Sequence, residues 1–228
     1  TGNTEENTQR EQNLKTAGQL FSFIQASPSP FHAVANMKRE LDAHGYAQLL
    51  EGEEWRLEEE GKYYVIRNGS ALIAFRIPKR DFTGFQIMAS HSDSPSFKIK
   101  ENPEMDVEGH YVKLNVEKYG GMLCAPWFDR PLSVAGRVIV RDGSRLVTRL
   151  VNIDRDLCMI PNLAIHMNRE ANEGYKYNVQ KDMLPLYGCG GSGGMFMEDI
   201  ARAAGVAQED MIGSDLFLYN RMEGSIWG

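Results

Sequence analysis

The sequence predicts an α/β protein in which an N-terminal α/β portion is followed by a β-rich portion. Two observations lead to this prediction: apolar residues recur at helical spacing near the N-terminus, and strand-like runs dominate from about residue 100 onward. A length of 228 residues with 42% hydrophobic content allows one large domain or two small ones with packed cores. We therefore expect a globular chain.

Two helices are predicted before the first strands. Residues 1–10 form a polar stretch that we expect to be disordered. After it, apolar residues at positions 14, 17, 20, 21 and 24 share one face of a helix, which the run Ser27-Pro28-Ser29-Pro30 ends. A second helix is predicted from Pro30, because proline is favoured in a first helical turn, to Gly45, because glycine commonly ends helices.

The strands of the α/β portion, residues 1–100, leave its sheet incomplete. Strands at 63–67 and 71–77 are separated by Asn68-Gly69-Ser70, which predicts a hairpin, and the apolar run 85–89 predicts a short buried strand. Three strands and two helices leave sheet edges unpaired and one face uncovered. This portion therefore needs further polypeptide to form a complete sheet.

The β-rich portion is predicted over residues 101–213. Its strand candidates are residues 111–117, 135–141 and 146–153, with Asp142-Gly143 favouring a tight turn between the last two. The glycine-rich stretch 189–194 predicts a flexible linker before a helix that Gly205 ends. Residues 216–219 predict another strand, and we expect residues 214–228 to return to the first portion.

Composition argues against two classes of partner. The formal net charge is −6, and Lys and Arg are scattered along the chain, so nucleic acid is not an expected partner. No apolar run approaches the roughly 20 residues of a membrane helix, and the N-terminus does not resemble a signal peptide, so we expect no membrane partner. The three cysteines form no C-x-x-C pair, which fits a cytoplasmic location.

His91 and Asp93, in the run His91-Ser92-Asp93-Ser94-Pro95, are the strongest candidates for chemistry. They lie two residues apart after an apolar strand, so in extended geometry both side chains point to the same side. A histidine can bind zinc through one ring nitrogen while a carboxylate holds the other. The same spacing also fits a histidine paired with an aspartate in an ordinary loop, and spacing alone does not decide between the two.

Other histidines and motifs favour structural roles. His32 lies in the first turn of the second helix, where packing or capping is expected, and His110 follows a charged stretch typical of a solvated loop. Taken alone, His166 after Leu163-Ala164-Ile165 reads as a half-buried strand or loop histidine. The run Trp127-Phe128-Asp129-Arg130 fits an active-site wall or interface as well as a local Asp–Arg salt bridge.

Across most of its length, the sequence resembles the aspartyl aminopeptidase family of dinuclear zinc exopeptidases. The resemblance rests on ordered matches from about residue 16 to residue 228. His91-Ser92-Asp93-Ser94-Pro95 is similar to the family's HTDSP segment, with Ser92 in place of Thr. The other matching segments are Ser27–Val34, Tyr119-Gly120-Gly121, Trp127–Arg130, Ala135–Val138 and Ile160–His166.

This resemblance implies a zinc-exopeptidase α/β sandwich with an inserted β-rich dimerisation and lid domain. It places the first zinc ligand on His91 and the aspartate that orients it on Asp93. It also implies that His166 reaches the active site of a neighbouring subunit and contacts substrate or the developing oxyanion. The implied activity is removal of N-terminal residues, acidic ones by default, from peptides by a hydroxide bridging two zinc ions in a homo-oligomer, expected to be a dodecamer.

The family's remaining zinc ligands and its general-base glutamate all lie beyond the point that matches Gly228. A catalytic zinc needs about three protein ligands, so this chain by itself is expected to be inactive. The alternative hypothesis is a non-catalytic oligomerisation module of a larger assembly.

Overall fold

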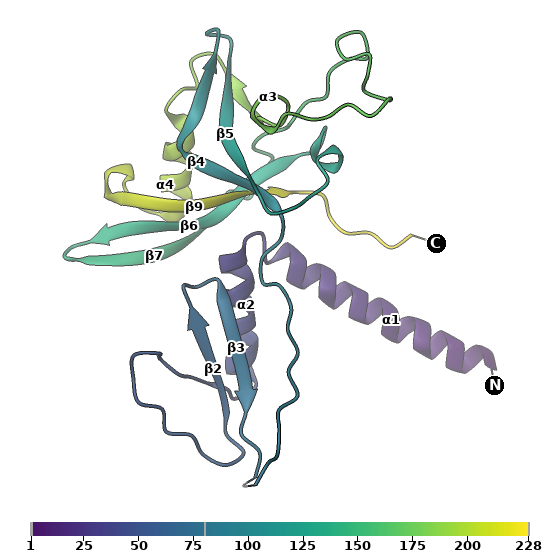
Figure 1. The fold of residues 1–228 in the computed structure, drawn as a ribbon, viewed down its shortest axis with the longest axis vertical. Coiled ribbons are helices and arrows are strands. Elements are labelled where there is room, and N and C mark those ends of the chain that lie inside the picture. Colours follow the sequence, from purple (N-terminus) through teal and green to yellow (C-terminus); the bar gives the residue numbers. More distant parts are fainter. Residues whose placement is uncertain (1, 80, 228) are drawn as a thin grey trace. The chain divides into compact units, whose positions relative to one another are not determined.

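A computed structural model describes residues 2–79 and 81–227, and it divides the chain into two compact units. The first unit comprises Thr1–Ser94 with Glu223–Gly228, and the second comprises Pro95–Met222. Figure 1 shows helices and strands in both units, which confirms the mixed α/β class. Among the described residues, no helix is both long and apolar enough to cross a lipid bilayer.

The first unit contains two helices and a small sheet. Its elements are α1 (Gly2–Gln25), α2 (Pro30–Ala43), β1 (Ala47–Gln48), β2 (Lys62–Arg67) and β3 (Ala71–Arg76), with sheet order β1-β2-β3. The predicted hairpin is confirmed: β2 and β3 pair antiparallel, and Asn68 and Gly69 between them have positive φ, which these two residue types tolerate. The buried side chains of this unit belong to α2 and β2, chiefly Phe31, Val34, Tyr63 and Tyr64.

The start of α2 follows from its sequence. Ser29 is the N-cap, its hydroxyl accepts a hydrogen bond from the His32 N–H, and Pro30 occupies the first turn. The Ser29 hydroxyl also lies 2.7 Å from His32 Nδ1. Burial lowers the pKa of His32, because a charged imidazole is poorly solvated there. The capping and packing role expected for His32 is therefore confirmed.

Two predictions for the first unit are wrong. Residues 2–10 are helical rather than disordered, since α1 begins at Gly2; this stretch contains several Glu, Gln and Arg residues, which favour a helix (residue 1 lies outside the described residues). The run 85–89 forms no strand, and its side chains are exposed: Phe85 by 72%, Ile87 by 85% and Met88 by 99%. The described residues supply no strand that pairs with this run, so its extended backbone lacks a ladder partner.

The second unit is built on a six-stranded sheet of order β7-β6-β9-β4-β5-β8. Its strands are β4 (Ser96–Val107), β5 (Tyr111–Tyr119), β6 (Leu132–Asp142), β7 (Arg145–Asn152), β8 (Leu186–Cys189) and β9 (Met211–Asn220). The helices are α3 (Val179–Asp182) and α4 (Met195–Ala204), and short 3-10 turns cover Ala125–Trp127 and Gln208–Asp210. The three predicted strands, the turn at Gly143 and the helix ended by Gly205 are confirmed.

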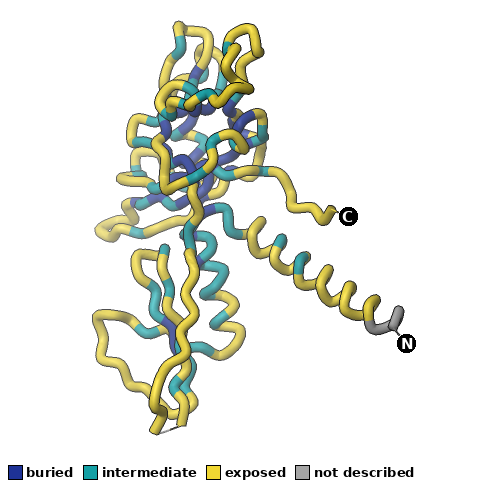
Figure 2. The backbone as a smooth tube through the Cα atoms, turned by 45° about the vertical axis from the view of Figure 1, so that its right-hand side comes forward, coloured by how far each residue is buried: buried dark blue, intermediate teal, exposed yellow. Residues whose placement is uncertain are grey.

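Isolated bridges join β6 to the edge strand β8. Leu132 at the start of β6 exchanges backbone hydrogen bonds with Cys158, and Met159 does the same with Leu186 of β8. Residues 158–159 therefore connect β6 to β8, and the ladder β6-β9-β4-β5-β8 closes on itself. The core cluster lies within this unit, and Figure 2 shows buried positions gathered in the second unit. Closure protects strand edges that would otherwise be free to pair with other chains.

The helix α4 is fixed to this closed sheet by packing and by charge. Phe196 and Ile200 are fully buried in the core cluster. At the other face of the helix start, the Glu104 carboxylate accepts hydrogen bonds from the N–H groups of Gly194 and Phe196, the latter at 2.9 Å. A carboxylate at a helix N-terminus satisfies free N–H groups and complements the helix dipole. The stretch 189–194, expected as a flexible linker, is thus held at both ends.

The unit boundaries differ from those predicted at residues 100 and 213, because both positions fall inside strands. β4 already begins at Ser96, and β9 runs to Asn220 and pairs with β6 over nearly its whole length. Asp215 on β9 also joins Lys98 and Arg137 of the flanking strands, each at 2.9 Å. Although burial alone would raise the pKa of Asp215, these two cations lower it. Residues 214–222 therefore belong to the β-rich unit, and only Glu223–Gly228 returns to the first unit.

We predict that Gly136→Ala strongly destabilises the chain. A Cβ at Gly136 would lie 1.9 Å from the backbone oxygen of Asp215, so β6 and β9 would have to separate. We expect the free energy of unfolding, measured with urea, to fall by roughly 3 kcal/mol or more. Gly213→Ala in the same sheet is the control, since its Cβ would meet only the Ile139 side chain at 4.0 Å. Equal stability of the two variants would contradict this account of the β6–β9 pairing.

His32 predicts a pH dependence of stability. Its folded pKa lies below the unfolded value of 6.5, so its contribution is present above pH 6.5 and is lost as the pH falls through the folded pKa. We expect His32→Gln to flatten the loss of urea stability between about pH 7 and pH 5. His44→Gln is the matched control, because His44 is exposed at the other end of α2. An unchanged pH profile in His32→Gln would rule out this linkage.

Candidate metal-binding and catalytic residues

His91 and Asp93 lie in the first unit and contact one another. His91 Nδ1 is 2.9 Å from Asp93 Oδ1, and the side chains are 91% and 33% exposed. The carboxylate therefore orients the imidazole ring and engages Nδ1, which leaves Nε2 accessible to a further partner. A histidine held through Nδ1 in this way has its second ring nitrogen free for another partner, such as a metal ion or a donor.

The loop that carries His91 is attached to the β2–β3 hairpin. The Ser92 hydroxyl donates a hydrogen bond of 2.7 Å to the backbone oxygen of Ser70, directly after the Asn68-Gly69 turn. The attachment fixes the backbone between His91 and Asp93 at its midpoint. It also explains why the pair is formed although the preceding run 85–89 has no strand partner.

The donor set fits one ligand of a zinc ion and not a complete site. Zinc is held by imidazole, thiolate and carboxylate groups, with three protein ligands in catalytic sites. Within residues 2–79 and 81–227, no group of three His, Cys, Asp or Glu side chains is close enough to hold a metal ion. The structure therefore brings together His91 and Asp93, and among the described residues no further His, Cys, Asp or Glu joins them in a group that could hold a metal ion.

His166 lies in the second unit, on the long loop between Ile160 and α3. Its side chain is exposed, as are the apolar side chains that alternate with it: Leu163 by 62%, Ile165 by 47% and Met167 by 75%. The half-buried position suggested by the local pattern is wrong. An exposed histidine among exposed apolar residues is available to meet another molecule.

The remaining candidates are structural. His110 is exposed in the β4–β5 turn, where its backbone oxygen accepts from the Gly190 N–H. The carboxylate of Asp129 accepts hydrogen bonds from Asn162 rather than pairing with Arg130. This aspartate therefore links the run 127–130 to a segment that is distant in sequence. No local pattern predicts this contact, because the two residues are 33 positions apart.

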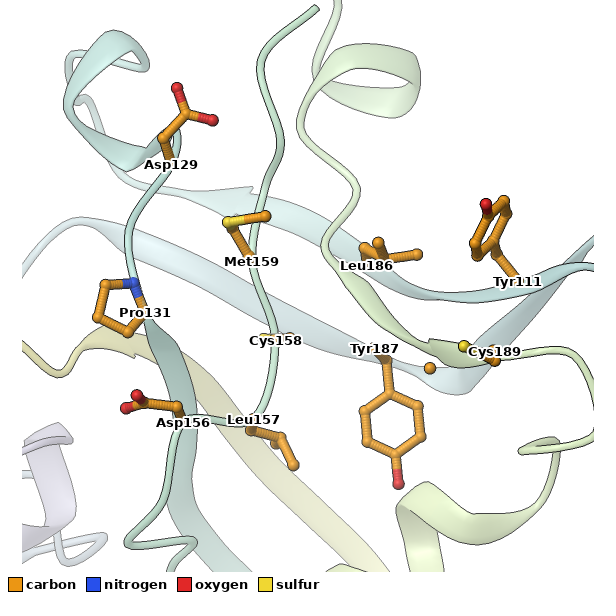
Figure 3. Close-up of a pocket in the computed structure, with 11 residues that line it drawn as sticks. Tyr111, Asp129, Pro131, Asp156, Leu157, Cys158, Met159, Leu186, Tyr187 and Cys189 are labelled. Carbon is orange, nitrogen blue, oxygen red and sulfur yellow. The ribbon is translucent and has the colours of Figure 1, made fainter.

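The three cysteines, and a pocket lined by two of them, Cys158 and Cys189, show no features of a second site among the described residues. Cys124, Cys158 and Cys189 are free thiols, and burial raises the pKa of Cys158 to about 12, which keeps this thiol protonated and unreactive. A pocket of about 510 Å³ lies at the seam between residues 156–159 and β8 (Figure 3). Asp129 and Asp156 at its rim do not converge in that view, and most of the lining is apolar.

The sequence matches the family described as aminopeptidase I zinc metalloprotease (M18) over residues 23–228. A relative named probable M18 family aminopeptidase 2, from Clostridium acetobutylicum, is 48% identical over 223 residues, which cover 94% of this chain and 52% of the relative. A protein of the same name from Pseudomonas aeruginosa is 42% identical over 217 residues, covering 92% of this chain and 50% of its own length. The chain thus spans about half the length of these curated relatives.

Solved structures show the same fold. A chain in the cryo-EM structure of the Ape4 and Nbr1 complex superposes with a TM-score of 0.86 at 32% identity, covering 93% of this chain and 45% of that one. A chain of the S. cerevisiae mApe1 dodecamer superposes with a TM-score of 0.76 at 26% identity, covering 93% of this chain and 50% of that one.

Proposed function

This chain belongs to the family of aminopeptidase I zinc metalloproteases (M18), and we propose that it forms part of an enzyme that releases N-terminal residues from peptides. The observation that carries this proposal is the His91 imidazole, held by Asp93 at 2.9 Å with Nε2 left accessible. Acidic N-terminal residues are the proposed substrates, following the resemblance to aspartyl aminopeptidases. The free cysteines agree with a cytoplasmic enzyme.

His91 would bind a zinc ion through Nε2, and Asp93 would keep the proton on Nδ1 and fix the ring direction. A pair of zinc ions at such a site polarises a peptide carbonyl and lowers the pKa of bound water. His91 and Asp93 provide one oriented ligand for it. A second part of the proposal is that His166 donates a hydrogen bond to the oxyanion that develops on a substrate bound in a neighbouring subunit.

The exposed run 85–89 supports the proposal that further polypeptide completes the site. Phe85, Ile87 and Met88 present apolar surface on an extended backbone that precedes His91 directly. A strand that paired with this run would cover these side chains and bring its own residues close to His91. The relatives are about twice as long as the segment that they share with this chain, so they contain further residues from which such a strand could come.

A non-catalytic oligomerisation module is the second candidate. This candidate is favoured by the closed second unit, because all the residues of its core cluster belong to that unit. Zinc content and peptidase activity distinguish the two candidates, because only the enzyme needs His91.

We predict that His91→Ala in the protein expressed from the complete gene abolishes hydrolysis of aminoacyl anilides. The loss of activity should exceed the ~100-fold loss caused by changes outside the ligand shell, because a metal ligand itself is removed. The zinc content measured by atomic absorption should also fall. Asp93→Asn should retain zinc better and lose roughly 10- to 100-fold in activity. His110→Ala is the control, since this exposed histidine lies in the β4–β5 turn. Full activity in folded His91→Ala would refute the proposed site.

We also propose that the protein self-associates through the β-rich unit, as a dodecamer, in line with the mApe1 assembly. β6 is an inner strand whose Ala135, Val138 and Val140 side chains are buried, so it offers less surface for this contact than an exposed loop does. The exposed apolar residues around His166 are better placed.

The triple change Leu163→Ser, Ile165→Ser and Met167→Ser should therefore lower the particle mass measured by sedimentation, because it removes exposed apolar area. Leu146→Ser with Leu150→Ser on the exposed face of β7 is the matched control and should leave the mass unchanged. An intact particle in the triple variant, or dissociation of the control instead, would place the interface elsewhere.

A further inference from the structure

We propose that Asp129 is a positioning residue that fixes the direction in which the loop bearing His166 leaves the β-rich unit. The loop comprises residues 161–178, and its middle is exposed. This inference rests on the proposed function, since Asp129 would act on peptide hydrolysis only through His166.

Asp129 holds the start of the loop with both carboxylate oxygens. Oδ1 accepts a hydrogen bond of 2.9 Å from the Asn162 N–H, and Oδ2 accepts one of 3.1 Å from the Asn162 side-chain amide. The Asp129 N–H in turn donates to the backbone oxygen of Ile160 at 2.9 Å. Three hydrogen bonds thus hold Ile160 and Asn162, which lie six and four residues before His166.

The body of the unit holds Asp129 rigidly on its other side. Phe128 is 9% exposed, forms a parallel bridge with the fully buried Ile160 and belongs to the core cluster. Asp129 itself has φ of 56°, a left-handed conformation that costs a non-glycine residue energy unless its surroundings stabilise it. The two bonds to Asn162 and the anchored neighbour supply that stabilisation.

The far end of the loop is held by a second carboxylate. Asp182 Oδ2 accepts from the Asn178 N–H at 2.6 Å and from the Tyr175 hydroxyl at 3.1 Å. The Tyr177 ring packs on Phe128 with ring centroids 5.0 Å apart. Both ends of the loop are therefore tied to the same part of the unit, and the segment between them carries His166.

The middle of the loop is exposed over residues 163–167, and Leu163 and Met167 line a pocket of about 260 Å³ together with Lys113 and Leu184 of the body. Turns within the loop fix its local shape, since the Met167 N–H donates to the backbone oxygen of Ala164. The hydrogen bonds at the two ends therefore contribute to where this segment as a whole lies. A displacement of only about 1 Å can cost as much as 100-fold in rate when the displaced group must meet a reacting atom.

Asp129→Gly tests the proposal without adding backbone strain, because glycine adopts a φ of 56° freely. Asp129→Asn keeps an acceptor for the Asn162 N–H and tolerates the same φ. In the protein expressed from the complete gene, we expect Asp129→Gly to lower kcat on the order of 10-fold with KM and zinc content unchanged. Asp129→Asn should recover most of this loss, and Asp156→Gly, another exposed aspartate of the unit, should cause none.

A double-mutant cycle separates positioning from a general structural role. In a His166→Ala background, Asp129→Gly should cause no further loss of kcat, because the group that it positions is gone. The proposal would be overturned if kcat of the double variant fell by the product of the two single-variant factors. It would also be overturned if Asp129→Asn did not restore kcat.

Hydrogen exchange keeps the inference separate from the proposed function. If His166→Ala leaves kcat unchanged, the proposed role of His166 fails, and exchange then tests the positioning itself. Amides of residues 163–174 should exchange faster in Asp129→Gly than in Asp129→Asn or the parent protein. Equal exchange in all three proteins would overturn the inference.

Discussion

The pairing of β6 with β9 is the constraint on which the β-rich unit depends. It joins Leu132–Asp142 to Met211–Asn220 over nearly their whole length, and no side chain larger than hydrogen fits at Gly136 beside the Asp215 backbone. Because β9 lies between β6 and β4, it links the hairpin β6–β7 to the hairpin β4–β5. The bridges at Leu132 and Met159 then close the ladder, and this closed body presents the loop with His166.

The described strands of the first unit form no comparably long pairing. The candidate site in this unit therefore rests on a local contact between His91 and Asp93. The three-stranded sheet of this unit leaves the run 85–89 without a ladder partner, yet the Ser92–Ser70 hydrogen bond holds the loop in which Asp93 orients His91. The hydrogen bond that orients His91 thus joins two residues that are close in sequence, and both lie within the described residues. The metal site that we propose would need further ligands, since the described residues bring no group of three His, Cys, Asp or Glu side chains together.

The sequence predicted local structure correctly where the residues that determine it lie within a few positions of one another. Ser29-Pro30 marked the start of α2, Asn68-Gly69 the hairpin, and the two-residue spacing of His91 and Asp93 their contact. It failed where distant residues decide. The run 85–89 reads as a strand but has no partner, β4 was missed because Pro103 and charged residues interrupt its apolar pattern, and the Asp129–Asn162 contact spans 33 positions. The family resemblance, rather than spacing, selected His166.

We propose that His91 binds a metal ion through Nε2 while Asp93 holds Nδ1. X-ray diffraction from crystals of the protein expressed from the complete gene, recorded at the zinc absorption edge, would locate this ion. We expect an anomalous peak about 2.0–2.1 Å from His91 Nε2, with Asp93 still on Nδ1. A zinc peak in the protein that lies away from His91, or one bound to Nδ1 with Asp93 displaced, would contradict it.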